Sequence, residues 1–421
     1  MIQTVSLLPG VTLRVFRDTR FKQGCLSVQF LRPMCREEAS VNALISAVLL
    51  RGCEAYPDLQ RITWKLDDLY GAAVGTLARR IGDCQGVGLY LSFLEDRFAL
   101  PGDQILAPML ELLEQLLLHP VTEGEGFCKA YVESEKKNLI STIESELNDK
   151  RAFAMGRLLK NMCREDSYGS PRLGDVEAVA AIDPVQAYSH YRRILRESPV
   201  ELFYVGSEAP EKLAEGLKKI FGTLARQVRS CPKTVPFRDG GTSDEVAQME
   251  VAQAQLCMGF VTPITNRHED HAAMQVANTV FGGGMTGKLF MNVREKMSLC
   301  YHIGSSYYGS KGILTVSAGI DAEKAQTVRE EVLRQLGACR AGDFRDEELR
   351  SAKEALLSGL RATHDSPGSI EGYYSTAAIS GLGLTPEAYM DKIRAVTRED
   401  VTRAAATVQL HSVFLLKGAD Q

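Results

Sequence analysis

The sequence lacks the features of a membrane protein or a nucleic-acid-binding protein. It has no uninterrupted apolar run near the roughly 20 residues that a membrane-spanning helix needs. Lys and Arg number 49 against 53 Asp and Glu, a net charge of −4, so no basic domain is present to bind nucleic acid. The opening stretch MIQTVSLLPGVTLRVF lacks the basic and apolar regions of a secretory signal, and it alternates as a strand does. We therefore expect a cytoplasmic protein with neither nucleic acid nor membrane as a partner.

Two common cysteine and serine motifs are also missing. None of the ten cysteines forms a C-x-x-C pair. Most of them lie within apolar runs such as AQLCMGF at 254–260, which indicates reduced core residues and not disulfides or a zinc knot. No G-x-S-x-G motif supplies a serine nucleophile, and no cysteine has an obvious histidine partner in the sequence. Catalysis by this chain alone would therefore need a site that only the fold assembles.

The pattern along the chain indicates an internal duplication. The segments PVELFYVG at 199–206 and HSVFLLKG at 411–418 are each a short apolar strand closed by Gly, half a chain length apart. A similar helix start, AIDPVQAYSHY or AVTREDVTRAA, precedes each of them. Upstream, each half contains an alternating strand, a pair of strands and a long amphipathic helix in the same order. These elements are expected at 24–33, 72–94 and 104–120 in the first half and at 255–263, 300–320 and 347–360 in the second.

This organisation predicts the fold class and a domain boundary. Blocks of strands and blocks of helices are typical of an α+β fold and not of a doubly wound sheet. The polar segment RQVRSCPKTVPFRDGGTSDE at 226–245 contains Pro and a Gly pair, as a linker does. We therefore predict an N-terminal domain at 1–235 and a C-terminal domain at 236–421.

The glycine-rich stretch FGGGMTGKLF at 281–290 nearly spells a phosphate-binding loop. Such a loop needs a closing Ser or Thr where Leu289 stands, a strand before it and a helix after it. Here Met274, Ala277 and Val280 fall on one helical face before the glycines. We therefore expect no nucleotide, and we predict a helix terminus at which glycine takes the left-handed conformation.

The residues that follow, GKLFMNVREKMSLCYHIGSS at 287–306, resemble the second-half signature of the insulinase and mitochondrial-processing-peptidase family. In that family a glycine-containing turn leads into S-x-L-F-x-x-V-R-E-x-x-x-L-x-Y, and here Lys288 replaces the usual small residue. The duplicated α+β unit is similar to the family's architecture over essentially the whole chain. The resemblance implies two tandem α/β roll domains, each a largely antiparallel sheet covered by helices.

Active members of this family carry an inverted zinc motif, H-x-x-E-H, that this chain has lost. Two His four residues apart share a helix face and can hold one Zn²⁺, while the Glu acts as base on the zinc-bound water. The sequence R-G-C at 51–53 resembles the family's K/R-G-T, which puts Ala43 and Ala47 at the His positions and Ser46 at the base position. The family's later Glu ligand falls on Thr142. The resemblance therefore implies no catalytic residue, metal or cofactor on this chain.

Arg294 and Tyr301 match a pair that the family uses to hold substrate main-chain carbonyls. Arginine offers a rigid fork of donors, and a tyrosine hydroxyl can donate to a developing oxyanion. Some bacterial two-chain members carry the zinc motif on one subunit and this pair on the other. The zinc-less subunit of mitochondrial processing peptidase has a substrate-handling glycine-rich loop at about this place. The resemblance implies that Arg294, Tyr301, Gly282, Gly283 and Gly284 bind a peptide substrate.

The first functional prediction is thus a non-catalytic subunit of a peptidase. It would pair with an insulinase-like chain that has an intact HxxEH and zinc, or self-associate, and would contribute residues to a shared chamber. The stretches RGCEAYPDLQ and DKRAFAMGRLLKNM narrow the resemblance to zinc-less members from Firmicutes. Those members are associated with the 5-aminopentanol modification of elongation factor P.

Two other functions stay open from the sequence. One is a proteolytically inactive peptide-binding or scaffold protein, in translation-factor modification for example. The other is a hydrolase with a relocated site, for which His268 and His271 in RHEDH are the best remaining metal ligands. The acidic residues between them favour a polar cap on the following helix, where a carboxylate offsets the helix dipole.

Overall fold

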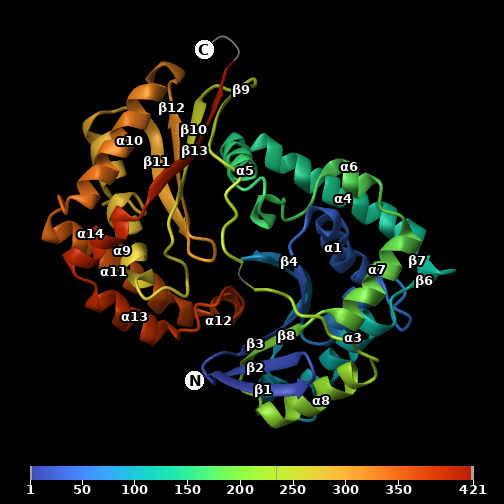
Figure 1. The fold of residues 1–421 in the computed structure, drawn as a ribbon. Coiled ribbons are helices and arrows are strands. Elements are labelled where there is room, and N and C mark those ends of the chain that lie inside the picture. The colour runs from blue at the N-terminus through green and yellow to red at the C-terminus, as the bar shows by residue number, and fades with distance from the viewer. Residues whose placement is uncertain (1, 234, 419–421) are drawn as a thin grey trace. The chain divides into compact units, whose positions relative to one another are not determined.

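Figure 1 shows a computed structural model of the chain, which describes residues 2–233 and 235–418. The chain forms two units. The N-terminal unit comprises Met1–Glu144, Ser170–Lys233 and His364–Ile379, and the C-terminal unit comprises Ser145–Gly169, Thr234–Thr363 and Ser380–Gln421. Each unit thus includes a segment from the other half of the sequence. The division into 1–235 and 236–421 stays a prediction.

The N-terminal unit is built on a six-stranded sheet with the order β1-β2-β8-β3-β5-β4. All neighbouring strands are antiparallel except β2 and β8, which are parallel. The strands are β1 (Ile2–Leu8), β2 (Val11–Arg17), β3 (Gln23–Pro33), β4 (Ala73–Ile81), β5 (Cys84–Leu94) and β8 (Val200–Gly206), and a small hairpin is formed by β6 (Thr122–Glu123) and β7 (Gly126–Phe127). The opening stretch, expected as one strand, forms the hairpin β1–β2, because Gly10 with φ 71° makes a turn between them.

The C-terminal unit repeats this sheet with the order β11-β12-β10-β13-β9. Its strands are β9 (Ser243–Gln248), β10 (Ala254–Val261), β11 (Cys300–Tyr308), β12 (Ile313–Ile320) and β13 (Gln409–Lys417). In chain order β10, β11, β12 and β13 correspond to β3, β4, β5 and β8, and β13 pairs with β9 in parallel as β8 pairs with β2. The same topology therefore occurs twice, and the predicted duplicated α+β fold is confirmed.

Helices of the N-terminal unit cover its sheet and form its core. They are α1 (Arg36–Leu49), α2 (Leu59–Asp68), α3 (Leu106–Leu118), α4 (Lys129–Asn148), α6 (Val176–Ala180), α7 (Pro184–Glu197), α8 (Pro210–Gly222) and α12 (Pro367–Ser380). The apolar spacing of α3 works as expected, because Met109, Leu112, Leu113 and Leu116 are all buried against the sheet.

The helix α12 comes from the second half of the sequence but packs on the N-terminal sheet. Ile370 and Tyr374 join Phe16 and Phe203 in an apolar cluster. Beside them the Glu371 carboxylate, which is fully buried, accepts hydrogen bonds from Ser27 Oγ at 2.6 Å, Gln29 Nε2 at 3.2 Å and Arg79 Nη1 at 2.9 Å. Donors on β3 and β4 thereby compensate the buried charge and fix the helix on the sheet.

Helices of the C-terminal unit lie on both faces of its sheet (Figure 1). They are α5 (Lys150–Met162), α9 (His271–Phe281), α10 (Ala325–Arg340), α11 (Asp346–Ala362), α13 (Pro386–Ala395) and α14 (Arg398–Ala406), together with the π-helix η3 (Leu289–Lys296). The main core fills the face under α9, α10, α11, α13 and α14. On the other face Ala154 and Leu158 of α5 pack against Cys257, Phe414 and Leu416. None of the described helices has the length and apolar character that crossing a bilayer requires.

Candidate functional site

Helix α1 carries the positions of the lost zinc motif, and their side chains serve packing. Ala43 and Ser46 are buried, and Ser46 Oγ donates to the carbonyl oxygen of Leu77 on β4 at 3.2 Å. Alanine has no ligand atom, and the serine hydroxyl is already bonded. Thr142, on α4, is exposed and donates to the carbonyl oxygen of Asn138 at 2.9 Å. These three positions and Ala47 do not fit a zinc ion, which takes imidazole, thiolate or carboxylate ligands.

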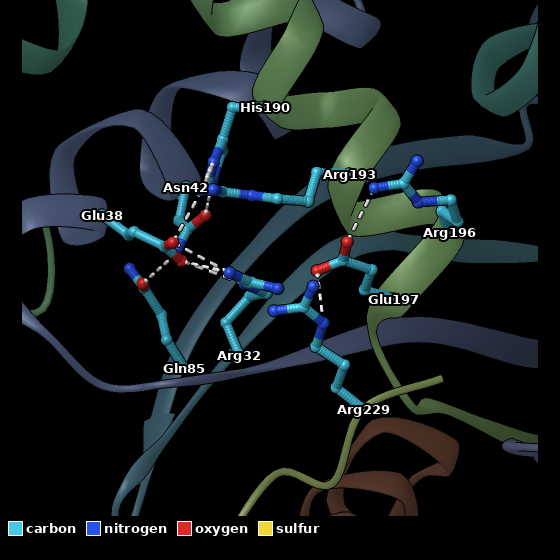
Figure 2. Close-up of polar contacts among 9 residues, drawn as sticks. All are labelled: Arg32, Glu38, Asn42, Gln85, His190, Arg193, Arg196, Glu197 and Arg229. Carbon is cyan, nitrogen blue, oxygen red and sulfur yellow. Dashed lines mark hydrogen bonds and ion pairs between the residues drawn. The ribbon is translucent and has the colours of Figure 1, made fainter. Parts of the chain in front are cut away.

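A polar network holds α1 in place next to these positions (Figure 2). Arg193 Nη2 lies 2.6 Å from His190 Nδ1, and since arginine only donates, Nδ1 is the acceptor and Nε2 carries the proton. His190 Nε2 then donates to Asn42 Oδ1 at 2.7 Å, and Asn42 Nδ2 donates to Gln85 Oε1 at 2.9 Å. Burial lowers the pKa of His190 to about 4, which keeps this chain of hydrogen bonds uncharged. The network is satisfied, so we assign it a structural role.

The alternative metal ligands in RHEDH are each engaged with their own partners. His271 is buried, with Nε2 3.0 Å from the Tyr389 hydroxyl and Nδ1 3.4 Å from the Tyr307 hydroxyl. His268 Nδ1 accepts from the backbone N–H of Asp270 at 3.1 Å. Asp270 stands at the N-cap of α9, as the cap hypothesis expects, but its carboxylate pairs with Arg403 at 2.6 Å and not with the helix N–H groups. Among the residues that the structure describes, no group of three or more His, Cys, Asp or Glu is arranged for a metal.

The glycine-rich stretch ends α9, as expected, but glycine is needed there for a different reason than the predicted one. A helix precedes the glycines, and Lys288 is buried with Nζ 3.7 Å from Glu348, so the phosphate-loop context is absent. The predicted left-handed conformation is wrong, because neither Gly282, with φ −164°, nor its neighbours have a positive φ. Close packing requires glycine instead: a Cβ on Gly282 would lie 2.5 Å from Leu289 Cδ1 and 3.0 Å from Ser305 Oγ. Gly284 faces open space.

These glycines line a cavity of about 710 Å³ in the C-terminal unit, which we call the β11 groove. One wall is the start of α5, with Asp149 and Arg151, and the other is the glycine stretch with Phe290. The floor is the open face of β11 and β12, where His302, Ser306, Thr315 and Ser317 alternate with core residues. A cavity of this size, with a few polar groups, is typical of a ligand site. Gly282, Gly283 and Gly284 are thus together in one groove.

Arg294 and Tyr301 lie near the groove but are not joined to each other. The Arg294 guanidinium stacks 4.7 Å from the centroid of Phe290, a groove residue, and lies 3.7 Å from Glu295. The Tyr301 side chain is exposed, and its hydroxyl donates to Asp321 Oδ1 at 3.1 Å. Within the described residues no hydrogen bond connects the pair. The predicted pair therefore stays a prediction, with each side chain placed at the surface of the same unit.

Sequence reasoning missed the groove residues Arg151, His302 and Ser317. The alternation of polar side chains along 302–317 was a usable signal for a polar sheet face. Arg151 gave none, because it lies in the first half of the sequence and reaches the groove only through the fold.

Comparison with known proteins supports the resemblance to the insulinase-like family. The family model described as Peptidase M16 inactive domain matches residues 181–356. The probable inactive metalloprotease YmfF of Bacillus subtilis (strain 168) is 28% identical over 411 residues, which cover 98% of this chain and 96% of that protein. A conserved protein from Enterococcus faecalis V583 superposes with a TM-score of 0.92 at 26% identity, over 100% of this chain and 99% of that one. A peptidase M16 inactive domain from Pseudomonas fluorescens shares the fold, with a TM-score of 0.82 at 18% identity, over 99% of this chain and 98% of that one. Over nearly its whole length the chain is therefore similar to inactive homologues of the insulinase-like M16 peptidases.

Proposed function

We propose that this chain is a non-catalytic peptide-binding subunit that uses the β11 groove. The observation that carries the proposal is the groove itself, which is built from Gly282, Gly283 and Gly284 and from the Phe290 ring under Arg294. Gly283 and Gly284 are exposed and leave main chain accessible to an extended peptide, and arginine can donate to peptide carbonyl oxygens. The described relative from Bacillus subtilis is named an inactive metalloprotease, which agrees with binding without chemistry.

The proposal includes a partner chain that holds the zinc. The positions Ala43, Ser46, Ala47 and Thr142 cannot supply ligands or a base, so any cleavage needs an insulinase-like chain with an intact HxxEH. Arg294 and Tyr301 are exposed enough to contact a peptide held by such a partner, since their side chains carry only surface contacts. This chain would carry no metal of its own.

The test is reconstitution with a zinc-bearing partner. The full chain is used to capture insulinase-like proteins from its native cytosol, and peptide cleavage is measured with the captured partner, with and without this chain. We expect cleavage to depend on both chains and to fall at least about tenfold with Arg294→Ala, the usual range for loss of a charged hydrogen bond. Arg361→Ala is the matched control, because Arg361 is a similarly exposed arginine of the same unit that pairs only with Glu354. Equal loss in both variants, or full activity of the partner alone, would contradict the proposal.

A scaffold function without proteolysis is the second candidate, and one observation favours it. The Tyr301 hydroxyl is hydrogen-bonded to Asp321, and the Arg294 guanidinium is stacked on Phe290. The two side chains therefore do not point toward one common substrate group. If the double variant Arg294→Ala, Tyr301→Phe retains normal function in cells while groove variants do not, the chain acts by binding alone.

A further inference from the structure

The floor of the β11 groove contains buried polar atoms without strong partners. His302 Nε2 is buried and has no hydrogen-bond partner, and the buried Ser317 Oγ has only the weakly hydrogen-bonding Cys257 thiol beside it. They are diagonal neighbours on one sheet face, because Gly304 of β11 pairs with Ser317 of β12 and His302 pairs with Gly319. Buried polar groups in native proteins are nearly always paired, and leaving one unpaired costs about 1–3 kcal/mol. A bound group that completes these hydrogen bonds would explain why they are present.

The groove lining also contains a cation at the start of α5. This is Arg151, whose side chain is exposed and whose guanidinium makes no ion pair with any residue that the structure describes. Burial lowers the pKa of His302, and Arg151 lowers it further. Burial raises the pKa of Cys257 to about 12, an effect that Ser317 and Arg151 oppose. Arg151 is thus the cation that acts on His302 in the groove.

Asp149 is the other charged residue of the groove, and it limits the charge of the ligand. Its Oδ1 atom accepts from the backbone N–H groups of Arg151 and Ala152, at 3.0 and 3.1 Å, and so caps α5. A ligand with a single carboxylate can form a bidentate pair with Arg151, and it brings only one negative charge near the Asp149 carboxylate. A doubly charged phosphate at the same place would face the Asp149 carboxylate with more repulsion.

We propose that the β11 groove selects peptide segments with an acidic side chain, whose carboxylate Arg151 binds while His302 and Ser317 hydrogen-bond the adjacent peptide groups. This inference rests on the proposed peptide-binding function and adds its specificity. Arg151 is the residue that determines the preference, since glycine main-chain contacts do not distinguish one side chain from another.

The experiment measures binding of three labelled decapeptides to the full chain by fluorescence anisotropy. The first is acetylated, amidated and has a central Glu, the second has Gln in its place, and the third is the Gln peptide with a free C-terminal carboxylate. We expect the Glu peptide to bind at least about tenfold more tightly than the amidated Gln peptide, as charge-assisted pairs to arginine do. Arg151→Met should bring this ratio close to one. Lys160→Met is the matched control, because it removes an exposed cation from the last turn of α5, outside the groove.

Each outcome separates the two proposals. If none of the peptides binds, the peptide-binding function fails and this inference fails with it. Equal binding of the Glu and Gln peptides overturns only the acidic preference, as does a ratio that persists in Arg151→Met. Tight binding of the free-carboxylate peptide that is lost in Arg151→Met would assign the site to a chain end and overturn the preference for an acidic side chain. Circular dichroism of each variant establishes that it is folded.

Discussion

The ion pair between Lys311 and Asp166 gives the sharpest prediction for the C-terminal unit. Lys311 follows β11 and Asp166 follows α5, and their side chains, 0% and 1% exposed, meet at 2.9 Å. The Lys311 ammonium also donates to the carbonyl oxygen of Val235 at 3.0 Å, and Asp166 Oδ2 accepts from the backbone N–H of Arg238 at 2.9 Å. The pair therefore fixes the segment after residue 234 on this unit. We predict that Lys311→Met destabilises the unit.

The magnitude follows from what remains after the substitution. Removing one partner of a buried ion pair costs about 3–5 kcal/mol, because the other charge stays buried. Asp166 keeps two backbone donors, Tyr168 N–H at 2.9 Å and Arg238 N–H, which compensate part of its charge. Methionine preserves most of the volume of the lysine stem and adds little cavity cost. We therefore expect a loss of about 3 kcal/mol in the free energy of unfolding.

Urea unfolding with two probes tests this prediction. The only tryptophan, Trp64, lies in the N-terminal unit and reports that unit by fluorescence, whereas far-UV circular dichroism reports both. Lys311→Met should shift a dichroism transition, while the double variant Lys311→Met, Asp166→Asn should recover part of the loss, since no uncompensated charge remains. A loss below about 1 kcal/mol, or a double variant that is as destabilised as the sum of the single ones, would refute the reasoning.

Two further predictions concern the glycine-rich stretch and a buried histidine. Gly282→Ala should cost about 1–3 kcal/mol, the range for overpacking, because its Cβ would overlap Leu289, whereas Gly284→Ala faces open space and should change stability by less than about 0.5 kcal/mol in the same urea assay. Burial lowers the pKa of His271 from 6.5 to about 4, so the folded state favours the neutral ring, and the stability this contributes is present above pH 6.5 and is lost as the pH falls toward 4. Between pH 7 and pH 5 the wild type should lose about 2 kcal/mol more than His271→Gln, and equal losses would contradict the low pKa.

Much of the fold could be predicted because the two halves of the sequence show the same order of strands and helices. The strands expected at 24–33 and 255–263 are β3 and β10, and those expected at 199–206 and 411–418 are β8 and β13. Each prediction on one half supported the other, and alternation or apolar runs closed by Gly are local signals. The assignment of α12 to the N-terminal unit was not predictable, since nothing near Glu371 indicates that its partners are Ser27, Gln29 and Arg79.

The site was less predictable, because its properties depend on contacts between distant segments. The lost zinc positions could be found by counting from a local motif, but the use of Ser46 as a donor to Leu77 could not. For the glycines, the sequence analysis predicted that a left-handed backbone conformation requires glycine. In the structure, close packing around Gly282 requires it instead. A left-handed glycine at a helix end has a local signature in the sequence, whereas the neighbours of a glycine in space have none.

The buried polar groups beside the former zinc helix and those in the β11 groove differ in their partners. Beside α1, Asn42, Ser46 and His190 all have hydrogen-bond partners. In the β11 groove, His302 Nε2 has none, and Ser317 Oγ has only the Cys257 thiol beside it. A protein retained for its fold alone gains nothing from such unpaired atoms, each of which costs about 1–3 kcal/mol and could be replaced by an apolar group. Unpaired polar atoms beside an accessible cation are expected where a ligand completes them. The ligand site that we propose for this inactive peptidase homologue therefore lies in the C-terminal unit, at the β11 groove.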